Sequence, residues 1–138
     1  MASARFQIVS PSSRAKTVDD RPNPSVIWRF MSGNNRNLGH AVRDFPDVDS
    51  CVAEVRELRH GVTAAACVII RADERNWAWR VRVDDVDYAE SSRRYNRRIQ
   101  AEHACASFVR QVVTAAGIYL IQRRDLYAEL DEVVSQGS

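Results

Sequence analysis

The chain has 138 residues, of which 45% are hydrophobic, and it carries 20 Lys and Arg against 18 Asp and Glu. This length predicts one compact domain or two small units that share a core, and the hydrophobic content excludes wholesale disorder. No apolar run approaches the roughly 20 residues that cross a bilayer, and the first residues lack the apolar segment of a secretion signal, so we expect a cytoplasmic protein with no membrane partner.

The N-terminal residues 1–24 are rich in proline and serine, which is typical of a flexible arm. Within this arm, only Phe6–Val9 has the apolar character of a strand. We therefore expect at most one docked strand before residue 25.

Residues 25–75 predict the order strand, strand, helix, strand. Val26, Trp28 and Phe30 recur at every second position, with Arg29 on the opposite side, which is the period of a strand with one buried face. Turn-forming residues at 32–37 then lead into a second strand over about 38–44.

The first helix is predicted to begin after an N-cap at Asp47 and to end at Gly61. Its apolar residues fall on one face at helical spacing. They are Val48, Cys51, Val52, Val55 and Leu58. The apolar run Cys67–Ile70 predicts a closing strand.

Residues 76–124 repeat this order. Apolar residues alternate over 77–83, aspartates at 84–87 predict a turn, and a second strand covers about 88–93. A helix is predicted after an N-cap at Asn96, with Gly117 as its end and a short apolar strand after it. Its apolar face comprises Ala101, Ala104, Cys105, Phe108, Val109 and Val112.

The two halves also match each other in sequence. Val62–Ala65 recurs 51 residues later as Val113–Ala116, and Trp28–Phe30 matches Trp79–Val81 at the same separation. Further matches, separated by 50 residues, are Phe45 with Tyr95, Cys51 with Ala101, Val55 with Cys105 and Leu58 with Phe108. Matches in the same order across strand, helix and strand indicate a tandem ββαβ repeat, whose copies are too short to stand alone and should share one core.

The second half carries the motifs of a known family, namely Trp79-Arg80-Val81, Ala89-Glu90-Ser91-Ser92-Arg93-Arg94-Tyr95, and Asn96-Arg97-Arg98 followed by Ala101 and Ala104. Together with Trp28, Ala41 and Phe45 in the first half, these motifs resemble the YegP-like family of small uncharacterised bacterial and archaeal proteins. The resemblance covers about residues 25–124. The chain departs from the family in having Arg97 and Arg98 where a lysine usually follows the tyrosine.

The resemblance implies an α+β fold, in which tandem ββαβ repeats form one shared antiparallel sheet, exchange their last strands and pack two helices on one face. It implies no activity. The predicted organisation is a flexible arm over 1–24, repeats over 25–75 and 76–124, and an acidic tail over 125–138. Apolar residues at helical spacing predict a short C-terminal helix in that tail.

No constellation of residues predicts catalysis, a cofactor or a metal site. The histidines and cysteines, which are His40, His60, His103, Cys51, Cys67 and Cys105, show no metal-ligand spacing. Three cysteines without a CxxC motif also argue against a disulfide framework, so we expect three buried structural thiols. The acids between 84 and 90 lack the spacing of a calcium loop and are typical of a solvated turn.

Arginines supply 19 of the 20 basic residues, a skew that a GC-rich genome explains as well as a binding role does. Residues 25–75 are neutral, whereas residues 76–124 carry nine Arg against five acids. Several of these cluster at the predicted start of the second helix, where helices normally prefer acids. The candidate anion or nucleic-acid binding residues are Arg29, Arg80, Arg82, Arg93, Arg94, Arg97 and Arg98. The alternative is that they pair with Asp84, Asp85, Asp87 or the acidic tail.

Two functions follow from these observations. The first is a non-enzymatic protein-interaction module, which binds a protein partner or self-associates through a sheet edge or the terminal helix. The alternative is binding of RNA or single-stranded DNA through the arginines, with Trp77 or Tyr88 available for stacking. The isoelectric point of about 8.6 is below that of a strongly basic nucleic-acid binder.

Overall fold

The computed structural model describes residues 3–10 and 25–121. Their elements are β1 (Arg5–Val9), β2 (Ile27–Met31), β3 (Asn37–Ala41), α1 (Val48–Gly61), the 3-10 turn η2 (Val62–Ala64), β4 (Ala66–Arg71), β5 (Trp77–Val83), β6 (Val86–Ser91), α2 (Arg98–Val113) and β7 (Ile118–Leu120). The predicted C-terminal helix and most of the predicted arm lie outside the described residues. Within the described part of the chain, no helix is long and apolar enough to cross a membrane.

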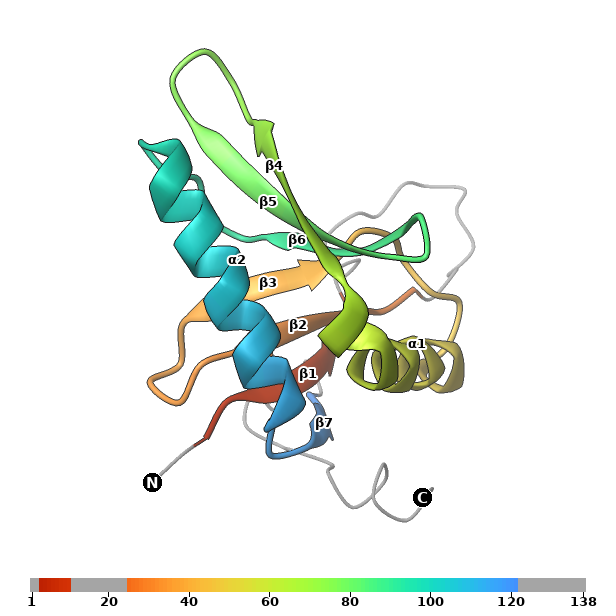
Figure 1. Cartoon of the computed structure of the whole chain (residues 1–138). Helices are drawn as coiled ribbons and strands as arrows, with labels where there is room; N and C mark the ends of the chain where they lie inside the picture. The colour runs from red at the N-terminus through yellow and green to blue at the C-terminus, as the bar shows by residue number, and fades with distance from the viewer. Residues whose placement is uncertain (1–2, 11–24, 122–138) are drawn as a thin grey trace, which may run out of the picture.

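The seven strands form one sheet in the order β4-β5-β6-β3-β2-β1-β7 (Figure 1). All neighbours run antiparallel except β1 and β7, which run parallel. The prediction of a wholly antiparallel sheet is therefore wrong, because the sheet is mixed. β4 pairs with β5 of the other half, as the family resemblance implies, whereas β7 pairs with β1 and not with a strand of residues 25–75.

The one strand expected in the N-terminal arm is an interior strand of the sheet. Phe6 and Ile8 of β1 are fully buried and lie opposite Phe30 and Trp28 of β2. Burial of these two large apolar side chains stabilises the docked position of β1. β1 lies between β2 and β7, and its parallel pairing with β7 makes the sheet mixed.

Both helices cover the same face of the sheet (Figure 1). Alternate residues of the strands point towards the helices, and among them Phe30 and Trp79 are almost completely buried. The ring of Phe108 in α2 contacts both, with centroid distances of 5.2 Å to Phe30 and 4.7 Å to Trp79. One hydrophobic core thus contains residues from both halves of the chain.

A close contact accompanies the pairing of β3 with β6, which joins the two halves of the sheet. A Cβ atom at Gly39 of β3 would lie 2.8 Å from Cη2 of Trp79 and 3.2 Å from Cε1 of Phe108. Real side-chain atoms do not pack at the shorter of these distances. The missing side chain at Gly39 therefore lets both aromatic rings pack directly on the backbone of β3.

Each helix begins the same number of residues after an isolated β-bridge of its own. Phe45 bridges Val26 and Tyr95 bridges Trp77, and the N-cap follows two residues later in each case. Asp47 caps α1 as predicted, because its carboxylate accepts from the Ser50 N–H at 2.8 Å. The prediction of Asn96 for α2 is wrong by one residue, since the bridge at Tyr95 places Arg97 at the N-cap.

A disulfide joins Cys67 of β4 to Cys105 of α2, with their Cα atoms 6.1 Å apart. This corrects the prediction of three free structural thiols, which holds for Cys51 alone. Spacing along the chain could not reveal the bond, because strand and helix meet only through packing across the sheet.

Reduction of the Cys67–Cys105 bond should lower the free energy of unfolding by about 2–4 kcal/mol, because the open chain gains unfolded conformations. Urea unfolding with and without reductant measures this loss. In Cys67→Ala the urea midpoint should not respond to reductant. A wild-type midpoint that is also unchanged by reductant would contradict the bond.

Candidate functional site

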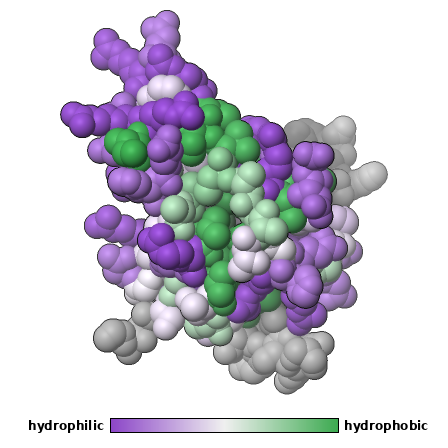
Figure 2. All heavy atoms as spheres, in the orientation of Figure 1, coloured by the Kyte–Doolittle hydropathy of each residue, from purple (hydrophilic) through white to green (hydrophobic). Residues whose placement is uncertain are grey.

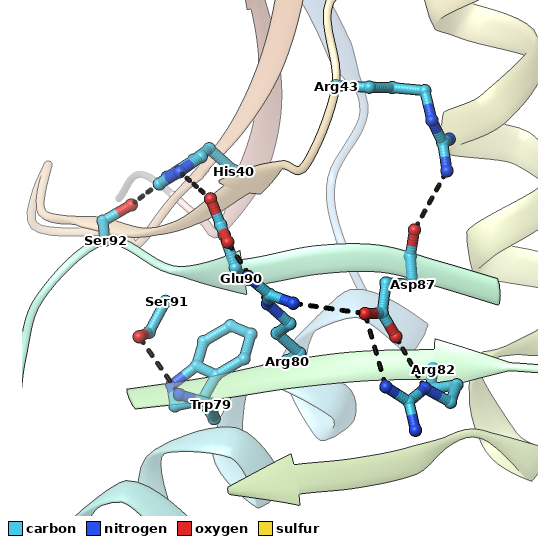
Figure 3. Close-up of polar contacts among 9 residues, drawn as sticks. All are labelled: His40, Arg43, Trp79, Arg80, Arg82, Asp87, Glu90, Ser91 and Ser92. Atoms are coloured by element: carbon cyan, nitrogen blue, oxygen red, sulfur yellow. Dashed lines mark hydrogen bonds and ion pairs between the residues drawn. The ribbon is translucent and has the colours of Figure 1, made fainter. Parts of the chain in front are cut away.

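The sheet face opposite the helices carries a series of polar contacts across three strands (Figure 3). Glu90 of β6 lies opposite His40 of β3 on one side and Arg80 of β5 on the other. Its carboxylate is 3.1 Å from His40 Nε2 and 3.4 Å from Arg80 Nε. The strand register thus places one acid between two basic side chains.

A second acid on β6, Asp87, binds two of the predicted anion-binding arginines. Arg82 Nε donates to Asp87 Oδ1 at 2.7 Å, and Arg80 Nη1 lies 3.5 Å from Asp87 Oδ2. The hydrogen bond from Arg82 lowers the pKa of Asp87 below its ordinary value and raises that of Arg82. Arg80 and Arg82 are therefore ion-paired with acids of the neighbouring strand, the alternative that the sequence left open.

Arg29, the third predicted arginine on this face, lies on β2, which β3 and β6 separate from β5. Its Nε donates to Oε1 of Gln7 in β1 at 2.9 Å. Burial lowers the pKa of Arg29 below its ordinary value, and the charge of Arg5 adds to this effect. The structure thus does not join Arg29 to the other two in one patch.

His40 also contacts a serine that the sequence did not single out. Its Nδ1 lies 2.9 Å from Oγ of Ser92, and the same hydroxyl lies 2.7 Å from Oδ1 of Asn37. Serine, histidine and Glu90 follow one another here as they do in hydrolases. The Ser92 hydroxyl also bonds to Asn37, so these contacts connect β3 with the residue that follows β6. These residues come together because β3 pairs with β6, two strands that are distant in sequence. No sequence motif would have identified them.

A buried carboxylate connects α1 to the sheet. Glu54 is 7% exposed, accepts from Trp28 Nε1 at 3.3 Å, and forms an ion pair with Arg43. Burial raises the pKa of Glu54 above its ordinary value and raises the pKa of the Cys51 thiol to about 12. A thiol with such a pKa stays protonated at neutral pH, so Cys51 is unsuited to nucleophilic chemistry.

The other four predicted arginines gather around the start of α2. Arg94 forms an ion pair with Asp73 at 2.9 Å, and Arg98 forms one with Glu102 at 2.9 Å. Arg93 lies over the ring of Tyr95, 5.4 Å from its centroid. Among the described residues, neither Arg93 nor Arg97 has an acidic partner within ion-pair distance.

An open hollow of about 290 Å³ adjoins this cluster and is lined by Arg93, Arg94, Tyr95, Asn96 and Gln100. Trp77, one of the predicted stacking residues, is half-buried, and the guanidinium groups of Arg71 and Arg98 lie 4.6 and 5.4 Å from the centroid of its ring. The other, Tyr88, directs its hydroxyl to Glu57 of α1 at 3.4 Å.

The predicted acidic turn connects β5 to β6. Asp84 and Asp85 have φ angles of 51° and 68°, the left-handed conformation that two-residue hairpin turns require. Within residues 3–10 and 25–121, no group of three or more His, Cys, Asp or Glu is placed to hold a metal ion.

β4 lies at one end of the described strand order, so one of its two edges has no described strand beside it. Ala72 N–H donates to the Asn76 carbonyl at 2.8 Å, so alternation along the strand directs the N–H and C=O groups of residues 66, 68 and 70 towards β5. Those of Cys67, Ile69 and Arg71 therefore point away from the sheet. Of the described strands, β5 alone pairs with β4.

Comparison with known proteins identifies the fold. No family model and no curated protein sequence matches the chain. The protein of unknown function YegP from E. coli matches in structure with a TM-score of 0.61 and 13% identity, over 87% of this chain and 94% of that chain. The UPF0339 protein SO3888 from Shewanella oneidensis matches with a TM-score of 0.62 and 9% identity, over 86% and 91%. The predicted resemblance to the YegP-like family is confirmed in its fold, and at such identities it carries no function.

The ion pairs of Asp87 predict a specific pH dependence. Because the folded-state pKa of Asp87 lies below its unfolded-state value, the stability it contributes is complete above about pH 4 to 5 and is lost as the pH falls through the folded-state pKa. Asp87→Asn should therefore lower the urea midpoint more at pH 7 than at pH 3, because the stabilisation declines as the pH falls below the unfolded-state pKa. Asp84→Asn, in the adjacent turn, is the matched control. An equal loss from Asp87→Asn at both pH values would show that the ion pairs do not stabilise the fold.

Proposed function

We propose that the chain is a non-enzymatic protein-interaction module, and that the outer edge of β4 binds an extended segment of a protein partner. The observation that carries this proposal is the composition of the edge. Five uncharged residues, Ala66 to Ile70, form an edge strand whose outward N–H and C=O groups have no partner among the described residues.

Edge strands of this kind are templates for another strand, and most proteins protect them with charges, prolines or bulges. β4 carries none of these between Ala66 and Ile70, and its pairing with β5 is regular over six residues. Figure 2 shows the molecule from the same side as Figure 1. Hydrophobic atoms gather along the middle of this view, where β4 and η2 run in Figure 1, with hydrophilic atoms on either side. The opposite sheet edge is β7, which has three residues. These features favour β4 as the edge at which a strand is added.

The tandem-repeat hypothesis for residues 25–75 and 76–124 belongs to the same proposal. The order strand, strand, helix, strand in both segments supports it, as do the matching bridges at Phe45 and Tyr95. In this arrangement, the closing strand of the first segment extends the sheet of the second, which leaves β4 at the edge.

A linear peptide display selection tests the proposed edge. The enriched peptides should carry aliphatic residues at alternate positions and bind the wild-type chain. Ile69→Pro removes the central outward N–H and places a ring in the path of an added strand, so affinity should fall at least about tenfold.

Ile69→Ala is the matched control, because it also loses the aliphatic side chain but keeps the N–H. Affinity for this control should stay within about threefold of the wild type. Selected peptides that bind Ile69→Pro and Ile69→Ala equally well would place the binding surface elsewhere.

Binding of RNA or single-stranded DNA is the second candidate, and the absence of acidic partners for Arg93 and Arg97 within the described residues favours it. Guanidinium groups at the start of a helix suit phosphate oxygens. Affinity for a single-stranded RNA should then fall steeply with salt, and Arg93→Glu combined with Arg97→Glu should weaken it. Arg80→Glu, on an arginine already paired with acids, is the control. Failure to bind at low salt would remove this candidate.

A further inference from the structure

The edge of β4 is suited to one partner in particular. We infer that a second copy of this chain pairs with it, β4 against β4 in antiparallel orientation, with Ile69 of each copy opposite Ile69 of the other. This inference rests on the proposed function of the edge and names its occupant.

The direction of the backbone groups selects this register. Cys67, Ile69 and Arg71 hold the outward N–H and C=O groups, and antiparallel pairs exchange hydrogen bonds only between residues of this set. With Ile69 opposite itself, Cys67 of each copy lies opposite Arg71 of the other. All outward groups of the three residues are then paired, whereas a register centred on Val68 or Ile70 leaves one residue of each copy unpaired.

The side chains agree with this register. Val68 and Ile70 lie opposite Arg80 and Ala78 of β5, on the face away from the helices. In the dimer, Val68 of one copy lies directly opposite Ile70 of the other, so four branched aliphatic side chains form one cluster across the two-fold axis. Cross-strand pairs of this kind stabilise sheets.

Charge does not oppose the pairing. The sole charged residue of β4 is Arg71, and this register places it opposite the neutral Cys67 and not opposite its own copy. A contact across a two-fold axis joins two identical surfaces, so each surface must be complementary to itself. The segment Ala66 to Ile70 carries no charge, and two copies of it therefore do not repel each other. It also lacks any charged group that would select a foreign strand.

The disulfide keeps this edge in place before pairing. Cys67 is in the outward set, and its side chain is bonded to Cys105 in the fully buried part of α2. The strand therefore loses less conformational freedom when it pairs.

Because one strand edge is smaller than a standard interface, we expect the Kd of the dimer to be micromolar and not nanomolar.

Hydrogen exchange at several protein concentrations provides the first test, with the full chain observed by NMR. The amides of Cys67, Ile69 and Arg71 should exchange more slowly as the concentration rises. Those of Val68 and Ile70, which bond to β5 in each copy, should be protected at every concentration and serve as the internal control. A chain that stays monomeric at millimolar concentration, or a dimer whose three outward amides exchange at an unchanged rate, would overturn the inference.

A charge exchange tests the register by sedimentation equilibrium. Val68→Glu and Ile70→Lys should each raise the Kd of the homodimer about tenfold, because each removes two aliphatic pairs and places like charges on the diagonal. Mixed in equal amounts, the two variants should form a heterodimer with a Kd within about threefold of the wild type, since the new carboxylate of one variant then faces the new ammonium group of the other. Thermal melts of both variants check that they fold.

A mixture that associates no better than either variant alone would overturn the register. A monomeric wild-type chain whose edge still binds selected peptides, with loss in Ile69→Pro, would overturn self-pairing and leave the proposed function standing. A dimer whose edge binds no peptide would support self-pairing and overturn the broader proposal of a foreign partner.

Discussion

The packing of two aromatic rings on a glycine backbone holds the two halves of this molecule in one sheet. β3 and β6 pair over three residues only, which is a short ladder for the central pairing of a seven-stranded sheet. Trp79 and Phe108 lie against Gly39 at this point, and Phe108 continues through Phe30 to Phe6 of β1. The aromatic contacts therefore cross five strands and supply the cohesion that the short ladder lacks.

A continuous sheet has consequences for both of its edges. One edge is the short β7, and the other is β4, which the disulfide anchors to α2. Since β4 belongs in sequence to the first half and in space to the second, the connection between the halves is itself the edge strand. This topology explains how an apolar strand with regular pairing comes to lie at the border of the sheet.

The pairing of the strands also decides which of the predicted arginines lie beside acidic side chains. On the open face, the register places Arg80 and Arg82 beside Asp87 and Glu90, so their charges are locally balanced. At the start of α2, the turn between β4 and β5 supplies Asp73 for Arg94, and α2 itself supplies Glu102 for Arg98. Within the described residues, no acid pairs with Arg93 or Arg97. Within the described residues, the two arginines of this cluster that have no acidic partner thus lie at the start of one helix.

Local pattern was enough to predict most elements of this fold. Alternation predicted β2 and β5, the spacing of apolar residues predicted both helices, and the carboxylate of Asp47 identified the first helix start, because each of these depends on neighbours within a few residues. The family resemblance, carried by short motifs, predicted the α+β architecture and the pairing of β4 with β5.

Contacts between distant segments were decided by the tertiary structure alone. The place of β1 beside β7, the Cys67–Cys105 bond and the series from His40 to Arg82 each join residues from separate strands or from a strand and a helix. Their formation depends on sheet register and on packing across the core, and neither leaves a periodic signal in the chain. The sequence by itself determined which faces are buried, because burial follows the local period, and the folded sheet determined which of the described arginines are paired and which described strand lies at its edge.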